Sequence, residues 1–104
     1  MNKTDNRPII EQLIAEALYT LSQELNLSAD HTPDIQIERC RELKFGDFSC
    51  NIAMLLAKPA KQNPRALAER LIALLPSHPH IAKVDTAGPG FINFTLTPAA
   101  RHAI

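Results

Sequence analysis

Apolar positions along the chain recur with two different periods, which predict helices and strands. Over residues 8–26 they recur at three- and four-residue spacing, which predicts an amphipathic helix. Asn6 is placed to cap this helix, and Pro8 is tolerated in its first turn. Polar residues over 26–33 predict a loop, and the alternation over 34–39 then predicts a short half-buried strand.

A turn is predicted where Gly46 precedes Asp47. We expect the aromatic rings on either side, Phe45 and Phe48, to anchor this turn to the core. The carboxylate of Asp47 could serve in catalysis, but its place beside a glycine favours a turn former or a helix cap.

Two further helices are predicted in the middle of the chain. Ser49 or Asn51 can cap the first, whose six consecutive apolar residues at 52–57 predict burial on nearly all sides. Asn63, followed by a proline, is typical of the start of the second, which we expect to stop at Pro76.

The last part of the chain predicts a hairpin. Strands are expected over 81–87 and 91–96, and the glycines Gly88 and Gly90 supply the unusual dihedrals of the turn between them. Thr97 and the following proline predict the start of a fourth helix close to the last residue, which favours a fragment of a longer polypeptide. The predicted fold class is α+β, a single domain with a small antiparallel sheet packed against three or four helices.

Composition agrees with one globular domain. The chain has 104 residues, of which 45% are apolar and 21% charged. It contains no apolar run long enough to span a membrane, and its first residues lack a signal-peptide pattern, so we expect a cytoplasmic protein.

Charge is unevenly distributed, although the formal net charge is zero. Residues 1–38 carry seven acidic and two basic side chains, whereas residues 39–70 carry seven basic and three acidic ones. The basic segment could meet RNA phosphates, with Lys58, Lys61 and Arg65 as candidate contacts, or it could be an ordinary solvated surface.

Few residues suggest enzymatic chemistry, and no catalytic residue is predicted. The three glycines do not form a phosphate-binding loop. His78 and His80 could bind a metal, although solvated loop histidines are commoner, and no metal site is predicted. Cys40 and Cys50 could act as nucleophiles beside a histidine, but structural or bystander thiols are favoured.

The last predicted strand offers a binding surface. Because side chains alternate across a strand, one face carries Ile92, Phe94 and Leu96, which suit a core. Phe91, Asn93 and Thr95 then lie on the other face. An aromatic ring two residues from an amide suits an unpaired base, since the ring can stack and the amide can read the base edge. The alternative is that Phe91 packs under a loop and Asn93 faces water.

Two motifs in order carry a resemblance to a known family. They are FGDFSCNIAMLLAKPAKQNPRALAERLI and IAKVDTAGPGFINFTL. Together they resemble the N-terminal additional domain of arginyl-tRNA synthetases, over essentially the whole chain. The family pattern includes Gly46, Asp47, Asn51, Gly88 and Gly90, and the resemblance implies mainly structural roles for the Gly-Asp motif. The predicted domain is 1–104, with the additional domain to about residue 97 and then the start of a linker helix to a catalytic domain outside this chain.

The resemblance also implies a function. The family's additional domain touches the outer corner of the L-shaped tRNA and helps to recognise a D-loop nucleotide. Phe91 and Asn93 match the family's base-reading positions; the family often has Tyr at the first, so Phe keeps the stacking surface without a hydroxyl. The full enzyme joins arginine to its tRNA with ATP and Mg²⁺ in a catalytic domain whose signatures do not occur in this chain, so no cofactor is expected for these residues.

A second function remains open from the sequence. The sheet face that carries Phe91 could dock on other domains of the same polypeptide or on another protein, without contacting RNA. Such a docking surface favours larger apolar groups than the Asn93 and Thr95 that stand there.

Overall fold

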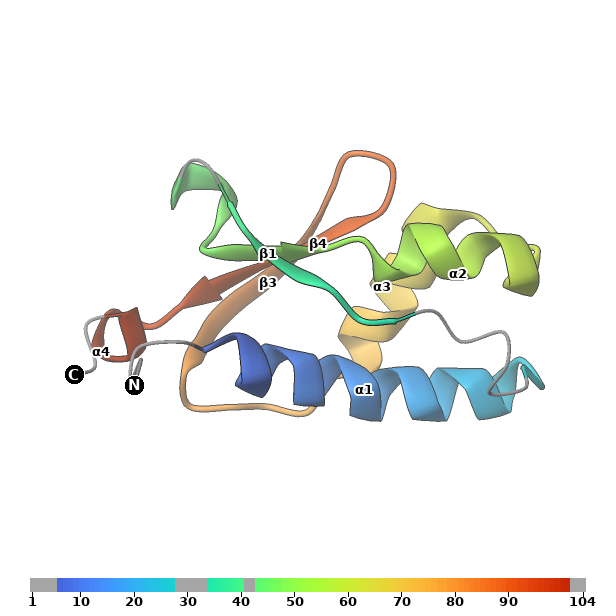
Figure 1. The fold of residues 1–104 in the computed structure, drawn as a ribbon, viewed down its shortest axis with the longest axis horizontal. Coiled ribbons are helices and arrows are strands. Elements are labelled where there is room, and N and C mark those ends of the chain that lie inside the picture. The colour runs from blue at the N-terminus through green and yellow to red at the C-terminus, as the bar shows by residue number, and fades with distance from the viewer. Residues whose placement is uncertain (1–5, 28–33, 41–42, 102–104) are drawn as a thin grey trace.

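The computed structural model describes residues 6–27, 34–40 and 43–101. Four α-helices, four strands and one 3-10 helix follow in the order α1 (Arg7–Glu24), β1 (Ile37–Arg39), η2 (Leu43–Phe45), β2 (Phe48–Cys50), α2 (Ile52–Ala60), α3 (Pro64–Leu74), β3 (Ile81–Ala87), β4 (Phe91–Leu96) and α4 (Pro98–Arg101) (Figure 1).

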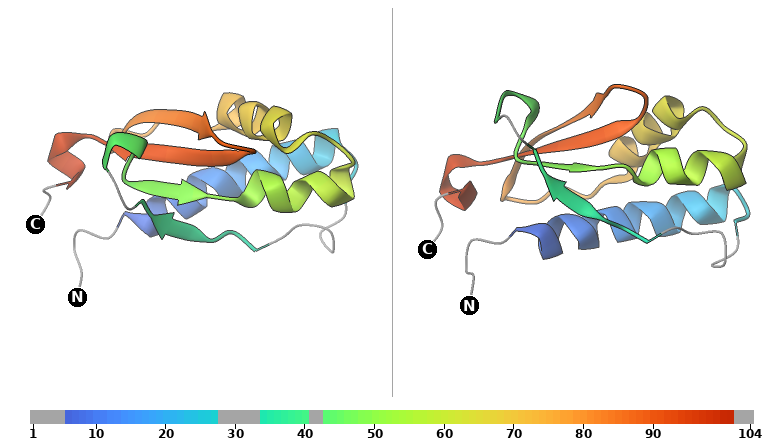
Figure 2. Two further views of the ribbon diagram at one scale, coloured as in Figure 1. Left: turned by 90° about the horizontal axis from the view of Figure 1, so that it is seen from above. Right: turned by 45° about the horizontal axis from the view of Figure 1, so that its top comes forward.

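The strands form one antiparallel sheet in the order β1-β2-β4-β3. The long helix α1 lies across one side of this sheet, while α2 and α3 pack together at one end of it, as Figure 1 and the left panel of Figure 2 show. The predicted α+β fold is therefore confirmed as a single core with two layers.

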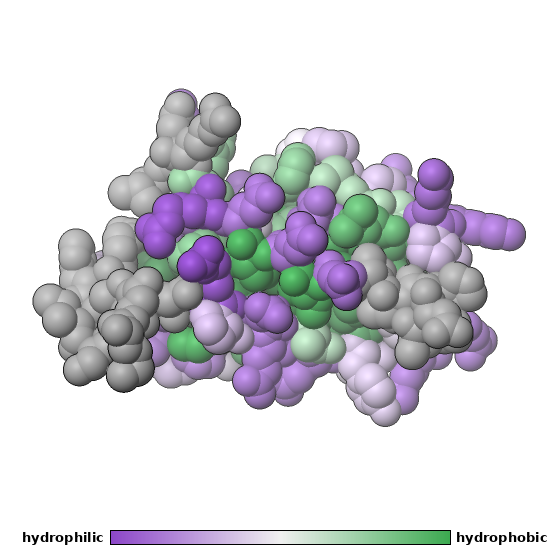
Figure 3. Space-filling view, in the orientation of Figure 1, coloured by the Kyte–Doolittle hydropathy of each residue, from purple (hydrophilic) through white to green (hydrophobic). Residues whose placement is uncertain are grey.

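The core lies between the helices and one face of the sheet. From the sheet it receives the inward side chains of β2 and β4, and from α1 and α3 it receives apolar side chains at helical spacing. The fully buried members include Ile10, Ile14, Leu21, Leu67, Leu71, Ile92 and Phe94. In Figure 3, hydrophilic side chains line the outer side of α1 along the lower rim, and apolar atoms gather between α1 and the sheet.

The sheet contains one strand more than the sequence pattern predicts. Residues Phe48–Cys50 form β2, so Ser49 lies within a strand and its predicted capping role is wrong. The strand pairs with residues more than 40 positions away, Phe48 with Phe94 and Cys50 with Ile92. Three residues are too few to display a period of two, so only this long-range pairing reveals the strand.

The predicted strand over 34–39 is shorter in the structure, where β1 begins at Ile37. The polar residues 28–33 of the predicted loop lie outside the described residues. Asn6 stands at the N-cap position of α1 and is buried, but its side chain makes no capping hydrogen bond to the helix.

Helix α2 is less buried than its apolar run predicts. Ile52, Ala53 and Leu56 are buried, but Leu55 is 45% exposed, because α2 packs on α3 and β4 along one side only. Asn51 occupies the N-cap position without a side-chain capping bond, and the C-cap residue Lys61, just after the helix, adopts the left-handed conformation.

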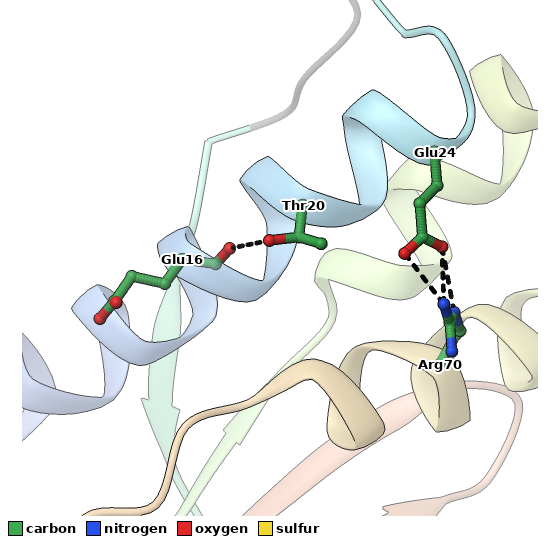
Figure 4. A network of polar contacts seen from close by, with 4 residues as sticks. All are labelled: Glu16, Thr20, Glu24 and Arg70. Atoms are coloured by element: carbon green, nitrogen blue, oxygen red, sulfur yellow. Dashed lines mark hydrogen bonds and ion pairs between the residues drawn. The ribbon is translucent and has the colours of Figure 1, made fainter.

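Helix α3 begins as predicted. The Asn63 side chain accepts hydrogen bonds from the backbone N–H groups of Arg65 and Ala66, at 2.8 and 3.2 Å. The helix ends at Leu74, two residues before Pro76. At its far end Arg70 forms a bidentate ion pair with Glu24 of α1, with a shortest distance of 2.8 Å, which ties the two helices together (Figure 4).

The two edges of the sheet differ. β1 has only three residues. β3 has seven, its pairing with β4 is irregular between Ile81 and Lys83, and the Lys83 ammonium lies 3.2 Å from the Asp85 carboxylate.

Candidate nucleic-acid interface

The sheet face turned away from α1 carries mainly polar side chains. We call it the open face, and the strand register assigns to it Glu38, Ser49, Lys83, Asp85, Ala87, Phe91, Asn93 and Thr95. The left panel of Figure 2 looks onto this face, with α1 behind the strands. A large partner can therefore reach the open face without displacing a helix.

Phe91 stands at the hairpin end of the open face. It pairs with Ala87 across the turn, and the residue is 38% exposed. Its ring has support from the turn, since a Cβ on Gly88 would lie 3.7 Å from Phe91 Cδ2. The ring is thus accessible to a ligand, and the backbone of Phe91 is paired within the central strand β4.

Asn93 occupies the middle of the same face. It is half-buried, and its neighbours in the sheet are Ser49 on β2 and Asp85 on β3. All three side chains are polar, so a ligand that lies on β4 meets hydrogen-bonding groups on both sides of the Asn93 amide. The structure therefore brings Phe91 and Asn93 together on one accessible face, as the strand alternation predicts.

Lys58, Lys61 and Arg65 lie around the connection between α2 and α3, and all three are exposed. The β3–β4 turn abuts this corner, since a Cβ on Gly90 would lie 3.0 Å from the Cβ of Pro64. Gly90 has a φ of +152°, so both its backbone and its surroundings favour glycine. Arg65, next to Pro64, is thus beside the hairpin end of the open face, while Lys58 and Lys61 stand at the C-terminal end of α2.

The turn at Gly46 and Asp47 is fastened to β4. Gly46 has a φ of +108°, and a Cβ there would lie 2.9 Å from the carbonyl oxygen of Phe94. The Asp47 N–H donates to that same oxygen at 2.7 Å, and the buried Asp47 carboxylate accepts from the Leu96 N–H at 2.7 Å. This carboxylate holds the turn against the sheet and caps no helix.

Phe45 does not anchor the turn, contrary to the sequence prediction. Phe48 is buried, with the Arg39 guanidinium 5.4 Å from its ring centroid, but Phe45 is 55% exposed. The anchoring is supplied instead by the backbone of Gly46 and the carboxylate of Asp47, which leaves the Phe45 ring outside the core.

A hollow of about 280 Å³ lies between η2 and the open face. Lys44 and Phe45 form one wall, and Lys83, Asp85, Asn93 and Thr95 are among the residues of β3 and β4 that line the rest. Among the residues that line the hollow, the sequence indicated only Asn93 as a functional candidate. The alternation of Lys83 and Asp85 within the predicted strand 81–87 was the available signal, whereas nothing in the local pattern indicated that Phe45 turns outward.

The histidine loop makes internal contacts. His78 Nδ1 accepts a hydrogen bond from the His80 N–H at 3.0 Å, and the two rings lie edge to face with centroids 4.9 Å apart. Among the described residues, no group of three or more histidine, cysteine, aspartate or glutamate side chains could hold a metal ion.

The surroundings of both cysteines disfavour the thiolate form. Burial raises the pKa of the Cys50 thiol above its ordinary value, against smaller opposing contributions from backbone hydrogen bonds. Burial also raises the pKa of the half-buried Cys40. Because the thiolate is the nucleophile, both environments disfavour nucleophilic chemistry at neutral pH.

Comparison with known proteins identifies the family. Residues 8–96 match the family described as the arginyl tRNA synthetase N terminal domain. The chain belongs to this family. It is 50% identical over 88 residues to an arginine–tRNA ligase of Idiomarina loihiensis and 54% identical over 85 residues to one of Pseudomonas paraeruginosa. These alignments cover 85% and 82% of this chain but only 15% and 14% of the two relatives.

Solved structures share the fold of this arginyl-tRNA synthetase N-terminal domain. An arginyl-tRNA synthetase from Plasmodium falciparum aligns with a TM-score of 0.71 at 19% identity, over 86% of this chain and 16% of its own. The Thermus thermophilus enzyme aligns with a TM-score of 0.70 at 25% identity, over 88% of this chain and 14% of its own. Within the described residues of this domain, no helix is long and apolar enough to cross a membrane.

Proposed function

We propose that this chain is the tRNA-docking domain of an arginine–tRNA ligase and contacts the outer corner and one D-loop base of arginine tRNA. The parent enzyme attaches arginine to its tRNA in the cytoplasm with ATP and Mg²⁺, which bind outside this domain. The other domains of that polypeptide are the second partner of this domain.

The observation that carries this proposal is the pairing of Phe91 and Asn93 on the open face. The exposed Phe91 ring stacks on an unpaired base, and the Asn93 amide, which offers a donor and an acceptor, reads its edge. Lys58, Lys61 and Arg65 contact phosphates beside the hairpin turn, where a backbone that places a base on Phe91 passes.

Binding by the isolated domain is expected to be weak. One stacked base and a few phosphate contacts supply about 4–6 kcal/mol, which corresponds to a dissociation constant of about 0.1–1 mM. The natural test is therefore an NMR titration of the ¹⁵N-labelled chain with an unmodified arginine tRNA transcript at low salt.

Two substitutions and a second transcript make the test specific. We expect localised shifts from Gly90 to Thr95, and we expect Phe91→Ala to weaken binding about tenfold through the loss of stacking. Asn93→Ala should weaken binding less and reduce discrimination against a transcript with the D-loop base changed. Tyr19→Ala is the matched control, because Tyr19 is an aromatic residue 67% exposed on α1, away from the open face.

Two outcomes would contradict the proposal. Equal, diffuse shifts with both transcripts would leave only electrostatic docking. No shifts at millimolar RNA would favour the alternative, in which the open face docks on protein.

A further inference from the structure

We propose that the hollow between η2 and the open face binds a second unpaired nucleobase of the same RNA, next to the base on Phe91, with Phe45 as its stacking platform. This inference rests on the proposed function and extends it from one nucleotide to two.

Phe45 is presented outward by rigid neighbours. The residue is 55% exposed, yet the adjacent Gly46 and Asp47 are fixed to β4 by a close backbone approach and by hydrogen bonds at 2.7 Å. The ring therefore stands at a defined place above the sheet without contributing to the core.

The wall around Phe45 has the chemistry of a single-strand binding site. The Lys44 ammonium lies 5.1 Å from the Phe45 ring centroid, so a positive charge stands beside the stacking surface. Proteins that bind single-stranded nucleic acids combine such aromatic platforms with cationic grooves along the phosphate backbone.

The floor of the hollow offers groups that can read a base edge. Asn93 supplies an amide, Thr95 a hydroxyl and Asp85 a carboxylate. The volume of about 280 Å³ is just below the range of about 300–1,000 Å³ typical of small-molecule pockets, so the hollow suits one planar ring system.

The charged side chains that line the hollow do not exclude an anionic ligand. Lys44, Lys83 and Asp85 are its charged lining residues, and the last two offset each other in an ion pair at 3.2 Å. The acidic side chains Glu11 and Glu16 lie on the exposed side of α1, across the molecule. A nucleotide phosphate therefore meets less negative charge at the hollow than along the exposed side of α1.

Phe45 and Phe91 stand at different points along β4, which favours a separate base on each ring. Phe45 precedes Gly46, which abuts Phe94 and Thr95, and Thr95 is four residues along β4 from Phe91. At about 3.3 Å per residue this separation is about 13 Å. Asn93 lies between the platforms and borders the hollow, which extends along β3 to Ala87, the partner of Phe91, without including Phe91 itself.

The first test measures binding of the arginine tRNA transcript to Phe45→Ala. We expect affinity to fall about tenfold, as for Phe91→Ala, and Phe45→Trp to retain it. Because the chain contains no tryptophan, Phe45→Trp also provides a local fluorescence signal, which we expect the transcript to quench. Tyr19→Ala serves as the exposed-aromatic control, and ¹H–¹⁵N spectra of all variants verify folding.

The second test separates two nucleotides from one. Transcripts carry an abasic site at each unpaired D-loop position in turn. The affinity of Phe45→Ala should no longer depend on one of these bases. The affinity of Phe91→Ala should no longer depend on the neighbouring base.

The outcomes distinguish this inference from the proposed function. If Phe45→Ala binds like the unsubstituted chain while Phe91→Ala is impaired, the second base is excluded and the proposed function stands. If both variants lose sensitivity to the same nucleotide, one base serves both rings and the two-base arrangement is wrong. If the unsubstituted chain does not bind the transcript, both proposals fail.

Discussion

At the scale of single residues, the Asp47 carboxylate links two parts of the chain that lie far apart in sequence. It is 6% exposed and accepts a hydrogen bond from the Leu96 N–H, 49 positions later. A buried backbone donor without a partner is costly, so this one oxygen holds both the turn and the end of β4.

Asp47→Ala should lower the free energy of unfolding by about 1–3 kcal/mol, because it leaves the Leu96 N–H without this acceptor. Asp47→Asn keeps an acceptor oxygen and should cost less. Urea unfolding measures both, with the exposed Asp85→Asn as control. Equal stability of Asp47→Ala and the unsubstituted chain would show that the hydrogen bond contributes nothing.

The two cysteines should make stability decline at alkaline pH. Burial raises the pKa of Cys50 and Cys40 in the folded state, so the unfolded chain releases these protons first. The stabilising contribution is complete below the unfolded thiol pKa of about 8.5 and is lost as pH rises through the folded values. Unfolding curves between pH 7 and 10 should show this decline, and Cys50→Ala should reduce its slope.

Local sequence patterns predicted the positions of Phe91 and Asn93 but not that of Phe45. Alternation along one strand placed Phe91 and Asn93 correctly, because a period of two needs only local information. The two aromatic residues beside the turn look equivalent in sequence, yet Phe48 is buried and Phe45 is exposed. Their difference depends on the pairing of Phe48 with β4, which no local pattern contains.

At the scale of elements, the β3–β4 hairpin is the unit that positions the candidate interface. Gly90 fixes where it meets the helices, since any Cβ there would lie within 3.1 Å of both Pro64 and Met54. Gly88, in the same turn, has a φ of +55° but only an ordinary contact at 3.7 Å. The two glycines thus differ in packing, but both have a positive φ that residues with a Cβ rarely adopt.

Gly90→Ala should therefore destabilise the domain more than Gly88→Ala. The second substitution carries mainly the backbone cost of about 1–2 kcal/mol, whereas the first adds the displacement of the turn from the α2–α3 corner. Thermal unfolding gives the order, and chemical shifts of Met54 and Arg65 report the displacement. A larger loss of stability in Gly88→Ala would contradict the packing argument.

Long elements were predictable and short ones were not. The helices over 7–24 and 64–74 and both strands of the hairpin agree with their apolar periods to within a few residues. β2 escaped prediction because its three residues carry too little pattern. The exposed Leu55 on α2 shows the same limit, since a continuous apolar run cannot tell which side a helix buries.

At the scale of the whole molecule, charge is unevenly placed, although the open face itself carries both signs in Glu38, Asp85 and Lys83. The exposed side of α1 carries Glu11 and Glu16, whereas Lys58, Lys61 and Arg65 surround the corner beside the open face. The acidic first part and basic middle part of the sequence predicted this imbalance, but not the sides on which it falls. The sheet order β1-β2-β4-β3 was also beyond prediction, since it joins segments more than 40 residues apart.

This uneven placement predicts how salt acts on tRNA binding. If the three basic side chains contact phosphates, the logarithm of affinity should fall with the logarithm of salt concentration at a slope of about −2 to −3. Lys61→Ala should reduce the magnitude of that slope by about 1, whereas Phe91→Ala should lower affinity and leave the slope unchanged. Titrations at three salt concentrations measure both, and identical slopes for Lys61→Ala and the unsubstituted chain would remove Lys61 from the phosphate contacts.

The irregular edge of the sheet has a consequence for any such titration. A strand edge with unpaired backbone groups invites another copy to add a strand, which at high protein concentration becomes aggregation. β1 is too short to serve as a template, and the break in pairing between Ile81 and Lys83, followed by the charged pair Lys83 and Asp85, interrupts the regularity of β3. The domain therefore has edges that resist self-association, so it can be studied at the concentrations that a weak complex demands.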